Sequence, residues 1–262
     1  PAGPLVQKVI SLGLDMRWRR AMAEGLKLRA GDRVADMATG TADVAIMISG
    51  ELAKLEEAAS QSQGEAPRAV FPEVVGIDPS ANMLGVGREK VAAMGLSSRV
   101  RLQIGDAQDL VGIADGSVDK ITMAFGIRNV PDRLKALREF SRILAPPGSG
   151  ASSSSSAPPS SSVLAILELQ NPESVLLAFA SRTFVKYVAP VLGWAMSGSG
   201  DGYTHLKNSI LNFPSVAEWT ALMEEAGEKY KCRFFGMLLV FSHQTMGFGT
   251  VHLYLARPRP GS

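Results

Sequence analysis

The stretch DMATGTADVA, residues 36–45, contains a single glycine, Gly40, with a threonine on each side of it. Two aspartates, Asp36 and Asp43, bound the turn. The apolar run at 33–37 predicts a short strand, and the run from 43 to about 59 predicts a helix. The stretch is therefore a tight strand-to-helix turn, the place where open α/β sheets bind ligands.

Outside this turn, strand-like and helix-like segments alternate along most of the chain. This order predicts an α/β fold, a doubly wound, mostly parallel sheet with helices on both faces. Ser80 is expected to cap one of the helices, and the polar residues 56–69 are expected to form an exposed extension or loop. The expected helices are 5–28, 43–59, 80–94 and 132–144, and the expected strands are 33–37, 74–78, 99–104, 118–124, 163–169, 233–241 and 249–255.

A single domain over 1–262 fits the chain length and its 46% hydrophobic content. Residues 145–162, APPGSGASSSSSAPPSSS, are of low complexity and interrupt a helix-to-strand connection, so they are interpreted as an insertion. Residues 173–215 begin with an apolar helical run. We interpret it as a cap over the substrate pocket; an entry for a lipid tail or a contact with a membrane surface is a compatible role.

Composition excludes several classes of function. The net charge is +2, and basic residues are not interleaved with aromatic ones, so no nucleic-acid partner is expected. The chain has one cysteine, Cys232, which excludes an internal disulfide and a cysteine metal cluster. No set of His, Asp and Glu has metal-ligand spacing, so no metal is predicted. No apolar run reaches the roughly 18 residues of a membrane span.

The sequence of the turn at residues 36–45 disfavours a phosphate-bearing cofactor. A dinucleotide fingerprint would need glycines at 38, 40 and 43, whereas the chain has Ala38 and Asp43, and the lysine of a P-loop is absent. Acidic residues at this place suit a cationic ligand, and S-adenosylmethionine carries a sulfonium and an ammonium. Asp36 or Asp43 would accept from the ammonium or organise the loop, and Gly40 would allow close approach. Thr41 would cap the helix or contact the methionyl carboxylate.

Two further carboxylates follow the next strands. Asp78 ends the second strand, where a carboxylate can accept from both ribose hydroxyls. Asp106 follows the third strand and is placed to accept from the adenine amine. Any one of these acids could simply cap a helix or turn, but three at successive strand ends favour a cofactor site.

The chain resembles the ubiquinone/menaquinone biosynthesis C-methyltransferase family. The stretches that carry the resemblance are SLGLDMRWRR, RAGDRVADMATGTADVA, VVGIDPSANMLGVGREKV, AFGIRNVPDRLKALREFSRIL, LELQNP and GYTHLKNSILNFPSVAEWTALMEEAG. The most specific is residues 124–144, because general methyltransferases lack its Phe-Gly-Ile-Arg-Asn. The resemblance implies a Rossmann-like seven-stranded sheet with an antiparallel last strand, and S-adenosyl-L-methionine as cofactor.

The resemblance also implies roles for individual residues. Arg128 and Asn129 would face the substrate ring, where Arg128, always protonated, would stabilise a developing phenolate or orient a water that takes the proton. The alternative for Arg128 is a surface ion pair with Asp132. The residues that would hold the cofactor are Thr41, Asp78, Asp106, Ala107 and Ala124.

The implied reaction is methylation of a ring carbon of a polyprenylated benzoquinol in ubiquinone biosynthesis. A naphthoquinol or another lipophilic acceptor such as a sterol remains open, as does a weakly active scaffold in a biosynthetic complex. Two departures from the family pattern keep the scaffold open, Ala42 in place of glycine and Asn208 in place of glutamate.

Partners and location follow from the same resemblance. A homodimer and a complex with other quinone-pathway proteins are expected. The serine-rich insertion and a start without methionine suggest an organellar protein that has lost a transit peptide, peripheral on the matrix side of the inner mitochondrial membrane, with the plastid as second choice.

Overall fold

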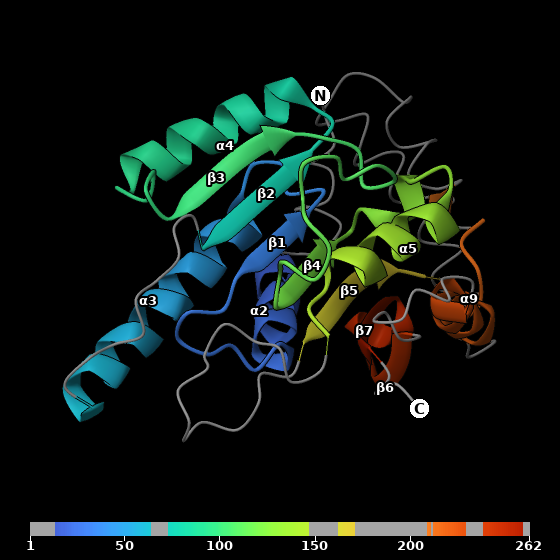
Figure 1. Ribbon diagram of the computed structural model, residues 1–262. Helices are drawn as coiled ribbons and strands as arrows, with labels where there is room; N and C mark the ends of the chain where they lie inside the picture. Colours follow the sequence, from blue (N-terminus) through green and yellow to red (C-terminus); the bar gives the residue numbers. More distant parts are fainter. Residues whose placement is uncertain are drawn as a thin grey trace.

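One twisted sheet runs through the described part of the chain (Figure 1). The computed structural model describes residues 14–63, 73–146, 162–170, 209–210, 212–228 and 238–258. The sheet has seven strands: β1 (Val34–Met37), β2 (Val74–Asp78), β3 (Val100–Ile104), β4 (Lys120–Ala124), β5 (Val163–Leu169), β6 (Leu238–Met246) and β7 (Val251–Pro258).

The strand order is β3-β2-β1-β4-β5-β7-β6. Strands β1 to β5 pair in parallel, and β7 pairs antiparallel with both β5 and β6. The predicted seven-stranded, mostly parallel sheet with an antiparallel last strand is therefore confirmed. The chain moves outward from β1 to β3 and then returns to β4 on the other side of β1. In open α/β sheets such a reversal marks the place where ligands bind, beside the carboxyl ends of β1 and β4, and the region between the loops that follow these strands is called the crevice.

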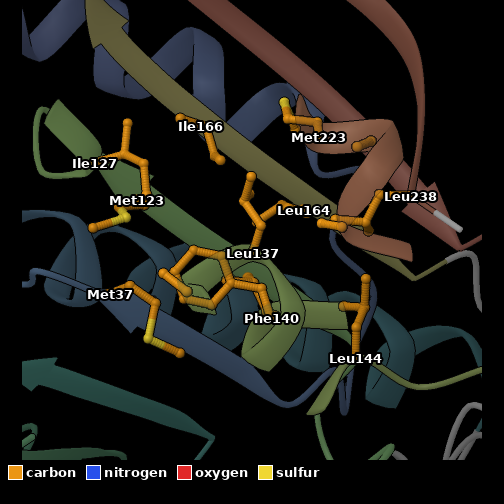
Figure 2. Close-up of a cluster of buried hydrophobic side chains, with 14 of the residues drawn as sticks. Met37, Met123, Ile127, Leu137, Phe140, Leu144, Leu164, Ile166, Met223 and Leu238 are labelled. Carbon is orange, nitrogen blue, oxygen red and sulfur yellow. The ribbon is translucent and has the colours of Figure 1, made fainter. Parts of the chain in front are cut away.

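Helices cover both faces of the sheet, as predicted (Figure 1). One face packs against α2 (Asp15–Gly25), α3 (Asp43–Gln63) and α4 (Ala81–Ala93), and the other against α5 (Arg133–Ile143) and α9 (Val216–Glu228). Figure 2 shows the second core, where Leu137 and Phe140 of α5 lie against Met37, Met123 and Leu164 of the strands. Two packed cores hold the sheet edge rigidly enough to position loops.

Local signals explain where several helices begin. The Ser80 hydroxyl accepts from the Met83 amide at 3.3 Å and caps α4 as expected. The Asp132 carboxylate accepts from the Lys135 amide at 2.9 Å and caps α5. In both helices the side chain satisfies an amide that has no partner within the helix.

Of the two alternatives for residues 56–69, the structure shows an extension over residues 56–63, which continue α3 beyond the predicted helix end at about residue 59. Glutamate, alanine and glutamine are good helix formers, and no glycine or proline occurs before Gly64. Glu56 also forms an ion pair with Arg99 at 3.0 Å, which ties this part of the helix to the start of β3. Polarity alone does not distinguish a helical extension from a loop.

Strand β4 begins two residues later than predicted, at Lys120, and Val118 makes only an isolated bridge to Leu144. Residues 5–13 of the first predicted helix, most of the insertion at 145–162, most of the cap segment at 173–215, and Cys232 lie outside the described residues. None of the helices within the described ranges is long and apolar enough to cross a membrane.

Candidate functional site

The turn between β1 and α3 is built from left-handed backbone. Ala38, Gly40 and Ala42 have φ angles of 51°, 56° and 64°. The Thr39 amide donates to the Ile77 carbonyl at 3.1 Å, and the Gly40 amide donates to Asp78 Oδ2 at 2.9 Å. The turn is thus fixed to the end of β2, and its backbone is shaped before any ligand arrives.

Ala42 occupies a position where a glycine would be unstrained. Its side chain is fully buried, and a Cβ added to Gly87 of α4 would lie 3.3 Å from the Ala42 Cβ. The methyl group therefore packs against α4. The backbone angle of Ala42 is nevertheless a strained one for alanine.

Exchanging Ala42 and Gly87 tests this packing. Gly87→Ala alone should destabilise the protein by about 2 kcal/mol, since the new methyl group meets Leu102 and the turn. Ala42→Gly alone should stay within about 1 kcal/mol of wild type, because relief of strain offsets a lost buried methyl group and added chain entropy. In the Gly87→Ala background, adding Ala42→Gly should restore about 1 kcal/mol of the lost free energy of unfolding, because it removes one of the clashing methyl groups. Urea unfolding measures the stability of all three variants. If the effects of the two single substitutions simply add in the double variant, the two side chains are not in contact.

Asp36 is buried beneath the turn. Its Oδ2 accepts from the Thr39 hydroxyl at 2.6 Å and its Oδ1 from the Thr122 hydroxyl at 2.7 Å. Burial raises the pKa of Asp36 from 3.8 to about 6, against the lowering effect of the two hydroxyls and of Arg19. Of the two roles considered for Asp36, the geometry supports organising the turn from below.

This pKa predicts a specific pH dependence of stability. Below pH 3.8 Asp36 is protonated in both the folded and the unfolded chain. As the pH rises to about 6, only the unfolded chain loses the proton freely, so the free energy of unfolding falls. Relative to wild type, Asp36→Asn should gain about 2.4 kcal/mol between pH 4 and pH 7. Urea unfolding at several pH values measures this difference; a constant difference would contradict it, and exposed Asp115→Asn serves as the control.

Asp43 and Thr41 form a small network at the start of α3. Lys90 of α4 donates to Asp43 Oδ1 at 2.8 Å and to the Thr41 hydroxyl at 3.0 Å, and that hydroxyl donates to Asp43 Oδ2 at 3.0 Å. The charge of Asp43 is therefore already balanced by a lysine. Contact of either residue with a cofactor stays a prediction.

Asp78 lies at the carboxyl end of β2, between two backbone amides. Its Oδ2 accepts from Gly40 and its Oδ1 from Ser80, at 2.9 and 2.8 Å. Each carboxylate oxygen keeps a second lone pair, so the side chain can still accept from two ligand hydroxyls. The two amides fix the orientation of the carboxylate.

Asp106 and Ala107 follow β3. The exposed Asp106 carboxylate accepts from the Gln108 amide at 2.9 Å and from the Gln108 side chain, contacts that lower the pKa of Asp106. Ala107 packs against the core under α5, and Ala124 ends β4. These residues lie at the same edge of the sheet as Asp78, because parallel strands end together.

The other side of the crevice is the loop after β4, which contains η1 (Ile127–Asn129). Arg128 is nearly buried, and its Nη1 donates to Glu168 Oε1 at 2.5 Å and to the Phe125 carbonyl at 2.7 Å. The alternative partner Asp132 is therefore wrong, since Arg128 pairs with Glu168. Within the described residues no acceptor contacts Arg128 Nη2, while Asn129 is exposed.

Two features of this side were missed from the sequence. Glu168 was overlooked, although a single carboxylate within the apolar run VLAILEL of β5 is a signal of a buried partner. Trp18, which the sequence does not mark as a site residue, borders a hollow of about 390 Å³ and lies edge-on to Phe125. The hollow is lined by Leu14, Arg17, Trp18, Ala21, Met246 and Gly247.

The crevice fits S-adenosylmethionine better than a nucleotide phosphate. Gly40 leaves room for close approach, Asp78 retains two acceptor positions, and the carboxylates of Asp78 and Asp106 would repel a phosphate. Among the residues that the structure describes, no cluster of three His, Cys, Asp or Glu side chains could hold a metal ion.

Comparison with known proteins agrees with this geometry. The model of the ubiE/COQ5 methyltransferase family matches residues 4–246. The chain belongs to this family. It is an S-adenosyl-L-methionine-dependent C-methyltransferase of the UbiE type, which acts in quinone biosynthesis.

Individual relatives of this UbiE-type chain are bacterial. The ubiquinone/menaquinone biosynthesis C-methyltransferase UbiE of Geotalea daltonii is 33% identical over 87% of this chain and 84% of its own length. The demethylmenaquinone methyltransferase of Thermus thermophilus is 33% identical over 92% and 94%. Among solved structures, a SAM-dependent methyltransferase from Aquifex aeolicus has the same fold, with a TM-score of 0.56, 17% identity, and coverage of 92% and 89%.

Proposed function

We propose that this methyltransferase acts on a ring carbon of a polyprenylated benzoquinol, with Arg128 facing a ring hydroxyl. The observation that carries the proposal is the guanidinium of Arg128. Glu168 and the Phe125 carbonyl occupy Nη1, and no described residue occupies Nη2. A fixed cation with a free nitrogen suits an oxygen on which negative charge develops.

Carbon methylation of a quinol needs this charge. Bound S-adenosylmethionine supplies an electrophilic methyl group. The ring carbon becomes nucleophilic when the adjacent hydroxyl loses its proton, and the ring hydrogen leaves after the new carbon–carbon bond has formed. Because one proton is released overall and Arg128 stays protonated, water is the expected acceptor and Arg128 stabilises the phenolate.

The hollow beside Trp18 supports an acceptor with an apolar substituent. Trp18, one of its lining residues, lies edge-on to Phe125, whose carbonyl accepts from Arg128, and this proximity supports a place for the acceptor's substituent in the hollow. Leu14, Trp18 and Met246 give it an apolar lining that suits an isoprenoid chain. Self-association, membrane contact and an organellar location stay predictions from the sequence.

The second candidate is a naphthoquinol. It is favoured by the names of two relatives, the demethylmenaquinone methyltransferases of Thermus thermophilus and Deinococcus radiodurans, which are 33% and 34% identical to this chain. Both candidates place a ring hydroxyl beside the carbon that is methylated, so Arg128 would have the same role in each.

A competition assay separates these candidates. The protein is incubated with S-adenosylmethionine and equal amounts of a short-chain 2-methoxy-6-prenyl-benzoquinol, a short-chain demethylmenaquinol and a sterol. Mass spectrometry identifies the methylated product, and NMR locates the new methyl group. The proposal predicts C-methyl benzoquinol as the main product.

Other outcomes contradict the proposal in different ways. Preference for the demethylmenaquinol would support the second candidate. A methylated sterol would exclude both quinols. Cofactor binding without turnover of any acceptor would support the scaffold role.

A further inference from the structure

Glu168 is a buried charge in an otherwise apolar strand. The other six residues of β5 are aliphatic, and the Glu168 side chain is fully buried. A carboxylate in such a place is destabilising unless hydrogen bonds satisfy its oxygens. Its position at the carboxyl end of β5 puts it at the edge of the sheet where the acceptor loop lies.

Both carboxylate oxygens of Glu168 accept hydrogen bonds, and Arg128 donates two of the three. Oε1 accepts from Arg128 Nη1 at 2.5 Å and from the Leu169 amide at 2.8 Å. Oε2 accepts from the Arg128 amide at 3.1 Å. Glu168 therefore binds the backbone and the side-chain end of Arg128 at once, which defines both the loop position and the rotamer.

The loop that carries Arg128 needs such a support. Phe125 has a φ of 58°, a strained value for an aromatic residue, and its carbonyl accepts from Arg128 Nη1. Arg133 holds the loop from the other side, with Nη2 donating to the Arg128 carbonyl at 3.1 Å. The Arg133 guanidinium lies 5.0 Å from the Phe213 ring centre, which limits its own movement.

Glu168 affects both the charge and the orientation of Arg128, and the two effects differ in their value for catalysis. The negative charge of Glu168 weakens the field that Arg128 can exert on an acceptor oxygen, so the pair cannot serve to maximise positive charge. What it provides is orientation. Nη1 is held, and neither Nε nor Nη2 has an acceptor among the described residues; Nε is buried, so Nη2 is the nitrogen that can reach an acceptor oxygen.

We propose that Glu168 is a positioning residue, which holds Arg128 so that Nη2 faces the ring hydroxyl of the acceptor. The inference rests on the proposed function and adds a residue to it. Glu168 acts through Arg128 and has no contact of its own with the acceptor.

The chain contains a matched control at the other end of the sheet. Asp119 accepts from the Arg33 amide at 2.9 Å and from Arg33 Nε at 3.0 Å, and it is as buried as Glu168. It therefore also binds the backbone and guanidinium of one arginine, but at the amino ends of β1 and β4. Asp119→Asn removes an equivalent charge far from the crevice.

A double-mutant cycle tests the inference. Glu168→Gln should lower kcat about 50-fold, with the Kd for S-adenosylmethionine unchanged, because only acceptor chemistry is affected. In an Arg128→Lys background the same change should lower kcat less than about threefold, because the aligned nitrogen is already absent. Asp119→Asn should leave kcat within about twofold of wild type. If Glu168→Gln does not fold, Glu168→Asp replaces it, since it keeps the charge but is too short to reach both donors.

A second measurement does not depend on turnover. Nitrogen NMR of the arginine side chains identifies the Arg128 signal as the one missing in Arg128→Lys. Held by Glu168, its guanidinium should rotate slowly, and the rotation should become fast in Glu168→Gln but not in Asp119→Asn.

The outcomes separate the inference from the proposed function. Full kcat on a quinol in Glu168→Gln would overturn the positioning role and leave the function intact. Equal losses of kcat in both Arg128 backgrounds would show a merely structural role and also overturn it. Wild-type protein that methylates no quinol would overturn the proposed function, and the positioning role with it.

Discussion

Replacing Arg128 by lysine is expected to lower kcat on a quinol acceptor by about 10²–10³-fold, the effect of losing one aligned donor in an oxyanion site. Lysine keeps the positive charge and can still pair with Glu168. It lacks the planar fork, so no second nitrogen remains for the acceptor oxygen. The Kd for S-adenosylmethionine should stay within about twofold of wild type, because only a step on the acceptor side is affected.

Lysine is a better test here than alanine. Arg128→Ala would leave Glu168 buried without a partner, which destabilises proteins by about 3–5 kcal/mol and would confuse lost chemistry with lost folding. Arg33→Lys is the matched control, since it alters the equivalent pair with Asp119. Steady-state kinetics with a quinol acceptor measure kcat, and calorimetry measures the Kd for S-adenosylmethionine. An unchanged kcat with weaker cofactor binding would place Arg128 on the cofactor side.

Removing the carboxylate of Asp78 is expected to weaken binding of S-adenosylmethionine by about two orders of magnitude. Hydrogen bonds to a charged group contribute about 1.5–3 kcal/mol each, so losing the expected ribose contacts accounts for such a change. Asp78→Ala also deprives the Gly40 and Ser80 amides of their acceptor, which loosens the turn. Calorimetry of the purified protein gives the Kd.

Two variants sharpen the test of Asp78. Asp78→Asn keeps one acceptor oxygen and should fall between wild type and Asp78→Ala. Asp115→Ala removes an exposed carboxylate that pairs with Arg142 away from the crevice, and it should leave the Kd unchanged. If Asp78→Ala binds the cofactor as wild type does, the ribose lies elsewhere and the assignment of this edge of the sheet is wrong.

The architecture was predictable because its signals are local and repeated. Alternation of apolar runs and helical periods is enough to predict a parallel sheet, and Ser80 marks a helix start by its own hydrogen bond. The helix end at Gln63, beyond the predicted end at about residue 59, has an equally local cause, since a polar sequence without glycine or proline can continue a helix.

The partners within the site were less predictable. The pairs Arg128–Glu168 and Asp43–Lys90 join residues 40 and 47 positions apart, and spacing in the sequence carries no sign of which charges meet. The left-handed angle at Ala42 is also invisible, because alanine is not a residue that signals it. Such features depend on how helices and loops pack once the sheet has formed.

The reversal of strand order beside β1 divides the sequence into two halves, one before β4 and one that begins at β4. The side chains expected to contact the cofactor follow β1, β2 and β3, whereas Arg128, Glu168 and the β6–β7 turn belong to the half that begins at β4. Of the elements before the reversal, α2 contributes Trp18 to the hollow that Met246 and Gly247 also line. Acceptor range can therefore diverge through changes in one half of the chain, while the methyl donor and its turn are inherited unaltered.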